Sequence, residues 1–159
     1  MDLNEVEKWL QGGDGDDEAM KLEQWEEALA CKFFDAFTVK GIHVDLVQRG
    51  RLVCSMKVPP RLINDLGNFL HSGAVTSLVD LVGSAVFFST GSPSSGVSIE
   101  ISVSYLRPAY LHDEIEIEAK VLRMGKRVGV AMVELREKKT GKLIAQGRHA
   151  KYLAVSSKL

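Results

Sequence analysis

The stretch FLHSGAVTSLVDLVGSAVFF, residues Phe69–Phe88, is a long apolar run that carries one acidic side chain. Asp80 is the only charged residue between His71 and Phe88. The run predicts a helix from about Ser72 to Phe88, and its apolar residues lie on all sides, so we expect it to be buried nearly all round. An ionised carboxylate in such surroundings is costly unless it is paired or hydrogen-bonded. Asp80 therefore needs an explanation.

The segments around this helix alternate between apolar and polar residues, which is typical of half-buried strands. The expected strands are Val39–Gln48 and Arg51–Val58 before the helix, and Val97–Leu106, Glu114–Arg123, Val128–Glu137 and Leu143–Leu153 after it. An Arg49-Gly50 turn joins the first two strands as a hairpin. One antiparallel sheet of about six strands, curled around the long central helix, satisfies this order and gives an α+β domain.

The chain of 159 residues fits a single globular domain with short extensions. The expected parts are a flexible acidic segment over residues 1–20, the domain over residues 21–155 and a tail over residues 156–159. At the start of the domain, Leu22, Trp25 and Leu29 share one face of a predicted amphipathic helix. This helix is expected to end at an aromatic cluster, which consists of Phe33, Phe34 and Phe37.

Composition excludes several classes of protein. Hydrophobic residues make up 45% and charged residues 26%, an ordinary soluble balance, and the net charge of -1 gives no basic field for nucleic acid. Cys31 and Cys54 lie far apart without zinc-type spacing, so we expect two free thiols in a reducing compartment. The acidic N-terminus lacks the features of a secretory signal. The most apolar stretch is too short for a membrane span and contains Asp80.

The last three residues, Ser157, Lys158 and Leu159, have the form of a peroxisomal address. This ending predicts an import receptor as a partner and the peroxisome as the location in a eukaryotic cell. The alternative is a chance ending on a cytoplasmic protein.

The start of the predicted helix suggests what Asp80 does. Asp80 lies seven residues after Gly73, two turns further along the same face. Ser72 and Gly73 carry free backbone N–H groups at the positive end of the helix dipole, and Gly73 has no side chain to block close approach. Such donors suit a developing oxyanion, and a carboxylate can attack or activate a water.

Each of these residues also has a structural interpretation. Asp80 can be a carboxylate that hydrogen-bonds the backbone of a neighbouring loop or subunit. Ser72 can be a helix N-cap, which does not exclude oxyanion binding. His71, directly before the helix, is more often a local hydrogen-bonding residue than a catalyst.

Three motifs in order resemble those of one family. LHSGAVTSLVD (residues 70–80) resembles the L-H-G-G-x-x-x-x-L-x-D signature of hotdog-fold acyl-CoA thioesterases. GVSIEISVSYLRPA (residues 96–109) and TGKLIAQGRHAKYL (residues 140–153) resemble the strand after the helix and the last strand of that family. The resemblance covers about residues 25–155 and is greatest to the PaaI-like branch. It implies the hotdog fold, a long helix held in a curled antiparallel sheet.

This resemblance implies hydrolysis of an acyl-CoA to a free acid and coenzyme A, without a metal or redox cofactor. Asp80 matches the general base or nucleophile, and Ser98 matches the serine that assists the attacking water. The backbone N–H of Ser72, directly after the motif's histidine, matches the group that polarises the thioester carbonyl. Asn64 matches the asparagine that orients the carbonyl or the water. Two departures are a serine where the family has glycine, and a loop one residue longer, which leaves Asn68 as an alternative to Asn64.

The same resemblance assigns a further group of residues, together with His71, to the site. The substrate-binding candidates are Gly73, Glu100, Tyr105, Arg107, Pro108, Tyr110, Arg123, Gly125, Lys126, Arg127 and Tyr152, with Lys151 as an additional basic residue. The basic side chains would face the phosphates of coenzyme A, and the alternative for each is a solvated surface charge. In enzymes of this kind two sheets pair edge to edge, so Asp80 of one subunit would face Asn64 and Ser72 of the other, and dimers often pair into tetramers.

Medium- to long-chain fatty acyl-CoA is the favoured substrate class. The alternative is an aromatic acyl-CoA such as dihydroxynaphthoyl-CoA, although plant peroxisomal enzymes for that substrate resemble a branch with a helix glutamate, and this helix carries Asp80. An enoyl-CoA hydratase on the same fold is a second class, but its histidine-loop motifs are absent. A non-catalytic acyl-CoA-binding module is a third, and it would not need Asp80.

Overall fold

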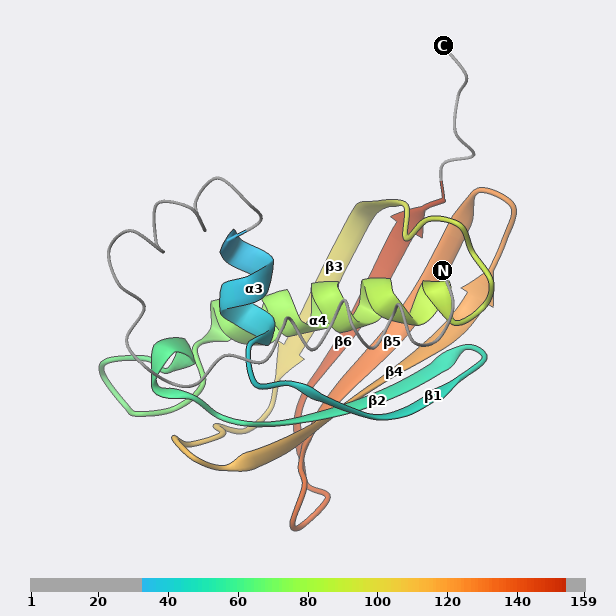
Figure 1. Cartoon of the computed structure of the whole chain (residues 1–159). Coiled ribbons are helices and arrows are strands. Elements are labelled where there is room, and N and C mark those ends of the chain that lie inside the picture. Colours follow the sequence, from blue (N-terminus) through green and yellow to red (C-terminus); the bar gives the residue numbers. More distant parts are fainter. Residues whose placement is uncertain (1–32, 154–159) are drawn as a thin grey trace.

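The computed structural model describes residues 33–153, which include every candidate site residue named above. Figure 1 shows its elements in sequence colours. In chain order they are α3 (Phe33–Val39), β1 (His43–Gln48), β2 (Arg51–Lys57), the 3-10 turn η1 (Pro60–Leu62), α4 (Ser72–Phe88), β3 (Val97–Tyr105), β4 (Glu114–Met124), β5 (Val128–Glu137) and β6 (Leu143–Tyr152). The predictions for residues 1–32 and for the tail lie outside the described residues.

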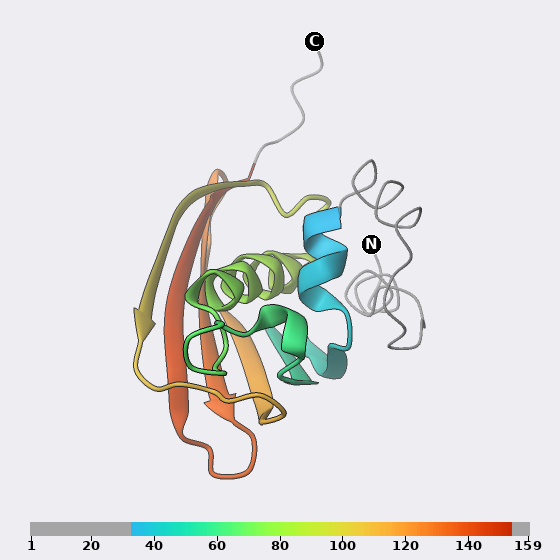
Figure 2. The same ribbon diagram turned by 90° about the vertical axis from the view of Figure 1, so that its left-hand side faces the viewer.

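The six strands form one antiparallel sheet in the order β1-β2-β4-β5-β6-β3. Figure 2, which views the molecule nearly along α4, shows the sheet curling around this helix, with α3 and η1 on the helix's other side. The predicted fold is confirmed: a long helix lies in the concave face of a curled antiparallel sheet, the hotdog arrangement.

Predicted boundaries agree closely with the structure except at Val39. Helix α4 has the predicted limits, and the four strands after it begin where expected. Val39, predicted to begin a strand, is instead the last residue of α3, and β1 begins at His43. Gly41 explains the difference, because its φ of 83° is the left-handed conformation that commonly ends a helix. The predicted hairpin turn is present, with Gly50 also left-handed at a φ of 76°.

The core lies between α4 and the inward face of the sheet. On β4 and β5, the side chains that face the helix are fully buried; they are Ile115, Ile117, Val133 and Leu135. Leu78 of α4, which faces the sheet, is fully buried as well. Removing each such side chain from water contributes about 1.5–3 kcal/mol. Cys54 of β2 is a buried free thiol, and burial raises its pKa to about 12. Within residues 33–153, no helix has both the length and the apolarity that a membrane crossing requires.

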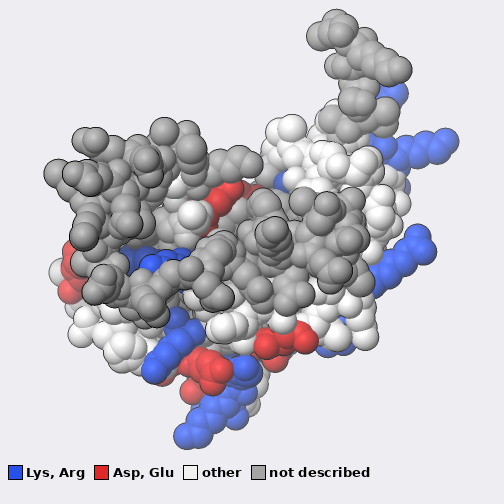
Figure 3. All heavy atoms as spheres, viewed as in Figure 1, with Lys and Arg blue, Asp and Glu red and all other residues white. Residues whose placement is uncertain are grey.

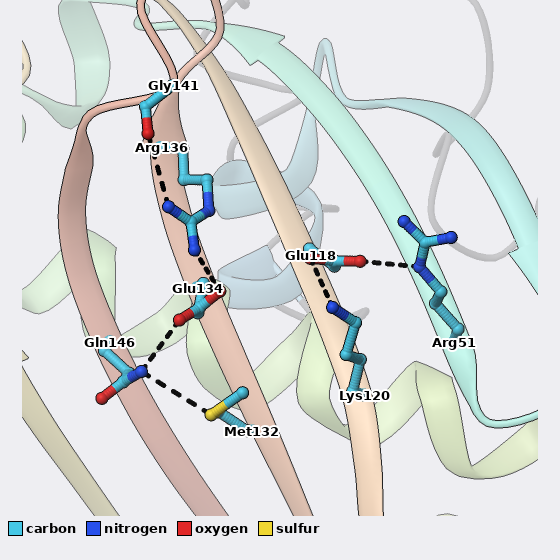
Figure 4. A network of polar contacts seen from close by, with 8 residues as sticks. All are labelled: Arg51, Glu118, Lys120, Met132, Glu134, Arg136, Gly141 and Gln146. Carbon is cyan, nitrogen blue, oxygen red and sulfur yellow. Dashed lines mark hydrogen bonds and ion pairs between the residues drawn. The ribbon is translucent and has the colours of Figure 1, made fainter.

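The outward face of the sheet is polar, and ion pairs and hydrogen bonds join its side chains (Figure 4). Glu118 of β4 contacts Arg51 and Lys120, with the nearest oxygen–nitrogen distances at 2.6 Å and 3.0 Å. Partial burial would raise the pKa of the Glu118 carboxyl, but hydrogen bonds from Lys120 and Arg51 outweigh it and lower that pKa. On β5, Glu134 contacts Arg136 at 2.5 Å. These charges keep the outward face solvated while the inward face packs on α4.

The two halves of α4 differ in exposure. All residues from Leu81 to Phe87 are buried, as predicted. The first half is not buried all round, since Ser72 and Gly73 are exposed and the Asp80 side chain is 43% exposed. The reason is that β3, the neighbouring strand on this side, is the last strand of the sheet. Edge strands present unpaired backbone groups and commonly pair with another chain.

Candidate active site

Three side chains from three elements meet at the exposed side of α4. Asp80 of α4 and Ser98 of β3 approach with 3.4 Å between the Asp80 Oδ1 and the Ser98 Oγ. His149 of β6 lies beneath them, with its Nε2 atom 2.8 Å from Ser98 Oγ and 3.4 Å from Asp80 Oδ1. Asp80 and Ser98, both predicted to be catalytic, are thus brought together across 18 residues of sequence.

His149 was not predicted as a site residue. Its side chain has no exposed surface. Burial and then the positive charge of Lys151 lower the pKa of His149 to about 4, although the charge of Asp80 acts in the opposite direction. The imidazole is therefore neutral at neutral pH. A sequence signal did exist: along β6, Gly147, His149 and Lys151 alternate on the inward side, where ionisable residues are unusual.

Two glycines let α4 approach β6 closely enough to form this cluster. A Cβ at Gly147 would lie 2.6 Å from a methyl carbon of Val79, the residue before Asp80. A Cβ at Gly83, on the helix, would lie 3.1 Å from the Nδ1 of His149. The absence of side chains at these positions allows the Asp80 turn of the helix to rest directly over His149.

Lys151 is buried and points inward, with 4% of its surface exposed. Its Nζ lies 2.5 Å from the hydroxyl oxygen of Ser84, and that oxygen lies 3.5 Å from Asp80 Oδ1. Lys151 is thus not a surface residue facing coenzyme phosphates, as considered from the sequence. Its position on the inward side of β6 places the ammonium group under the helix.

The start of α4 is capped by His71 rather than by Ser72, which corrects the predicted cap. The Nδ1 atom of His71 accepts a hydrogen bond from the backbone N–H of Gly73 at 2.9 Å. His71 is thus the local hydrogen-bonding residue that the sequence favoured. Within the described part of the chain, nothing accepts a hydrogen bond from the backbone N–H of Ser72. This exposed donor is free to bind a ligand oxygen.

Tyr105 and Thr76 support this helix start from the side. The Tyr105 hydroxyl lies 2.6 Å from the Thr76 hydroxyl and donates to the carbonyl oxygen of Ser72 at 3.4 Å. Tyr105 was a predicted substrate-binding residue, whereas Thr76 was not predicted. Thr76 stands one turn after Ser72 on the helix, so its spacing alone could have indicated it.

Asn64 lies in a turn alongside the helix start. Its backbone N–H donates to the carbonyl oxygen of Phe69 at 2.7 Å, and its side-chain oxygen accepts from the backbone N–H of Leu66 at 2.7 Å. The Asn64 amide nitrogen therefore remains available as a donor. Asn68, the alternative, has a left-handed φ of 51° and an exposed side chain without a hydrogen-bond partner among residues 33–153.

The free backbone N–H of Ser72 and the carboxylate of Asp80 lie far apart along the axis of α4. Asp80 follows Ser72 by eight residues, and a helix rises about 1.5 Å per residue, so about 12 Å of axis separates them. Reacting atoms must come within about 3–3.5 Å of one another. Within one chain, these two groups therefore do not meet at one carbonyl carbon.

The predicted substrate-binding residues are mostly exposed, and two surface hollows contain several of them. A hollow of about 910 Å³ lies between the β1–β2 turn, the α4–β3 loop and the β4–β5 turn, where Gly125 and Lys126 line it. A smaller one of about 240 Å³ is lined by Arg107, Pro108 and Tyr110 among others.

Basic side chains gather near the larger hollow. On the right of Figure 3, Lys and Arg side chains project where the β4–β5 turn lies in Figure 1. Arg123, Lys126 and Arg127 are exposed at this turn. Glu100 and Tyr152, on β3 and β6, are exposed but line neither of the two hollows.

Comparisons with known proteins agree with this geometry. A family model described as the thioesterase superfamily matches residues 67–144. Acyl-coenzyme A thioesterase 13 of Mus musculus is 43% identical over 103 residues, which cover 65% of this chain and 73% of the relative. The crystal structure of zebrafish thioesterase superfamily member 2 superimposes with a TM-score of 0.74 at 31% identity, covering 86% of this chain and 100% of that one. The PaaI protein of the E. coli phenylacetic acid degradation operon gives a TM-score of 0.66 at 26% identity, covering 84% and 99%.

Proposed function

Because the chain belongs to the thioesterase superfamily, we propose that it hydrolyses the thioester bond of an acyl-CoA to a carboxylic acid and coenzyme A. The observation that carries this proposal is the Asp80 carboxylate. It is half exposed on an apolar helix and held at one oxygen by hydroxyl groups. Its other oxygen accepts no hydrogen bond from residues 33–153, which leaves it available to a substrate or a water. The mouse relative's name, an acyl-CoA thioesterase, supports the same activity.

The proposed reaction uses Asp80 and Ser98 on the attacking side. Asp80 takes a proton from a water positioned beside the Ser98 hydroxyl, and the water oxygen bonds to the thioester carbon. The carbon–sulfur bond then breaks, and the sulfur of coenzyme A leaves with a proton. In the alternative course Asp80 attacks the carbon itself, the carbon–sulfur bond breaks to release the thiolate of coenzyme A, and water hydrolyses the resulting anhydride.

The groups that bind the carbonyl oxygen of the thioester are proposed to come from a second copy of the chain. A backbone N–H such as that of Ser72 stabilises negative charge on the carbonyl oxygen as the tetrahedral intermediate forms. Since about 12 Å of helix separates Ser72 from Asp80, one chain does not place both groups on one carbonyl. Pairing two sheets along the open edge of β3 would bring Asp80 of one copy opposite Ser72 and Asn64 of the other. Val97 and Ile99 of this strand, 66% and 57% exposed, favour such an interface.

Coenzyme A is proposed to lie at the larger hollow, because the smaller one is at the opposite end of β5, about 30 Å away. Its phosphates carry several negative charges, which Arg123, Lys126 and Arg127 at the β4–β5 turn can neutralise. Arg107 at the smaller hollow is a further candidate if it is contributed by the second copy of the chain. For the acyl group we propose a medium- to long-chain fatty acid, with an aromatic acid as the alternative.

A thiol-release assay tests the proposal. The purified protein is mixed with a panel of fatty acyl-CoAs of increasing chain length and with aromatic acyl-CoAs, and free coenzyme A is measured. We expect release of coenzyme A to be fastest within the medium- to long-chain series. Crotonyl-CoA is included because a hydratase would consume its double bond without releasing thiol. Tight binding of acyl-CoA with no turnover across the panel would contradict the proposal and favour a binding module.

A further inference from the structure

Lys151 is a buried cation for which the proposed reaction has no use. Its ammonium nitrogen contacts the Ser84 hydroxyl at 2.5 Å, and no carboxylate of residues 33–153 lies within ion-pair distance of it. A buried ammonium without a charged partner is destabilising by several kcal/mol. Burial lowers the pKa of Lys151, and the charge of Asp80 acts against that effect. The nearest stabilising charge is thus Asp80, one hydroxyl away.

Two series of hydrogen bonds converge on the same oxygen of Asp80. In the first, the ammonium of Lys151 donates to Ser84 Oγ, and the Ser84 hydroxyl donates to Asp80 Oδ1. In the second, Ser98 donates to Asp80 Oδ1, and His149 Nε2 contacts the Ser98 oxygen. Both series of hydrogen bonds run from β6 to α4 within one polypeptide, and both pass through a serine hydroxyl.

The protonation of His149 decides which atoms donate in the second series of hydrogen bonds. The Nδ1 atom of His149 is buried and has no hydrogen-bond partner in the described structure. A buried N–H without an acceptor is rarer than an unsatisfied buried acceptor, so the proton belongs on Nε2. His149 then donates to Ser98, which frees the Ser98 hydroxyl proton for Asp80. Because the imidazole is neutral, Lys151 supplies the positive charge of the cluster.

The other oxygen of Asp80 remains open. None of the residues from 33 to 153 donates a hydrogen bond to Asp80 Oδ2. The titratable groups that face Asp80 from the packed elements are His149 and Lys151 of β6, while β3 contributes Ser98 and α4 contributes Ser84. The cluster therefore holds one oxygen from below and presents the other to solvent.

We propose that Lys151, acting through Ser84, is a positioning residue that stabilises the negative charge of Asp80 and fixes its Oδ1 atom, so that Oδ2 faces the substrate. This inference rests on the proposed function, since it assigns Lys151 to the same reaction. It differs from a coenzyme-binding role, which would need Lys151 at the surface. It also differs from a packing role, which would not depend on the charge.

Lys151→Gln removes the charge and keeps a hydrogen-bond donor on a side chain that is one bond shorter. A shift of one pH unit corresponds to a factor of about ten on the acid limb, so we expect kcat to fall about tenfold at a pH well below the midpoint and to change little at neutral pH. The acid limb of the kcat profile should move to higher pH by about one unit, because the carboxylate has lost its nearby cation. KM should stay within about twofold, since the coenzyme is bound elsewhere. Lys139→Gln, at an exposed turn lysine, is the matched control and should leave kcat, the acid limb and KM unchanged.

Ser84→Ala is the second variant, and it tests the relay without removing the cation. It should shift the acid limb in the same direction by a smaller amount. It also covers the case in which Lys151→Gln does not fold, because deleting one hydroxyl oxygen leaves the apolar packing intact. A rise in KM without a change in the pH profile of either variant would overturn the proposal in favour of substrate binding.

A second measurement does not depend on activity. The carboxyl carbon of Asp80 is followed by NMR during a pH titration, with Asp80→Asn used to assign the signal. Lys151→Gln should move the titration midpoint of this carboxyl upward even if no acyl-CoA is hydrolysed. A moved midpoint in a protein without thioesterase activity would refute the proposed function and keep the charge coupling. An unmoved midpoint in a folded variant would overturn the role of Lys151, whatever the activity.

Discussion

The hydroxyl oxygen of Ser98 lies 2.8 Å from the Nε2 atom of His149, although 51 positions separate the two residues in sequence. This contact joins the edge strand β3 to the buried face of β6. With the imidazole proton on Nε2, the Ser98 hydroxyl is oriented toward Asp80. The Ser98 hydroxyl and the Asp80 carboxylate are thus held from beneath by a neutral histidine.

Ser98→Ala should slow hydrolysis without weakening substrate binding. In the proposed reaction the hydroxyl positions the attacking water and one oxygen of Asp80, so its loss is expected to lower kcat by about 10²-fold, toward the lower end of acid–base effects. Steady-state kinetics with a saturating acyl-CoA gives the value. Ser102→Ala, on the same strand with an exposed side chain, should behave like wild type. Equal kcat values for the two variants would mean that Ser98 takes no part in the reaction.

The stability of the protein should depend on pH through His149. In the unfolded chain this side chain takes up a proton near its ordinary pKa of 6.5, whereas in the folded protein its pKa is about 4. The unfolded state therefore binds more protons between these values, and the free energy of unfolding falls as pH drops from about 6.5 to about 4.

Urea unfolding of wild type and His149→Gln at both ends of this pH range measures the effect. Because glutamine does not titrate, the variant should lose less of its unfolding free energy on acidification than wild type does. His43→Gln, at an exposed histidine, is the control and should follow wild type. The same pH dependence in all three proteins would show that His149 is not the group responsible.

The shared site can be tested by mixing two inactive chains. If Asp80 of one copy works with Asn64 of the other, a hybrid of Asp80→Asn and Asn64→Ala chains contains one intact site. Random assembly should then restore about a quarter of wild-type activity, since half of the dimers are hybrids with one of two sites intact. Co-expression of differently tagged chains, followed by thiol-release assays, provides the measurement. No recovery in verified hybrids would place the whole site within one chain.

The ending Ser157-Lys158-Leu159 predicts peroxisomal import when it is the exposed C-terminus. A fluorescent protein fused before Met1 should mark peroxisomes in eukaryotic cells, and the same fusion placed after Leu159 should remain in the cytosol. Diffuse fluorescence from the first fusion would remove this localisation.

The fold and half of the site could be predicted because their signals are local. Helix α4 has the predicted limits since its apolar run ends at a loop rich in glycine and serine, and the strands alternate with period two. Asp80 stands out as the one charge in that run. His149 was missed, and Lys151 was assigned to the surface, because their partners Ser98 and Ser84 lie 51 and 67 residues away. Only the strand order, with β6 between β5 and β3, brings these pairs together.

The helix cap was assigned one residue late for a related reason. Serine is the commoner N-cap, and nothing in the sequence showed that the His71 ring would turn back onto the N–H of Gly73. The exposure of Asp80 was also missed, because the helix is apolar all round and the sheet ends at β3 on that side.

The turnover of Asp80→Asn tests the central claim most directly. Asparagine removes the negative charge of Asp80 with almost no change in volume, so folding and assembly can be checked against wild type by circular dichroism and light scattering. With a saturating acyl-CoA, kcat should fall by about 10²–10⁴-fold, the range for losing an acid–base group, while KM changes little. A kcat within about threefold of wild type, small beside that range, in a folded and correctly assembled variant would contradict the catalytic role of Asp80.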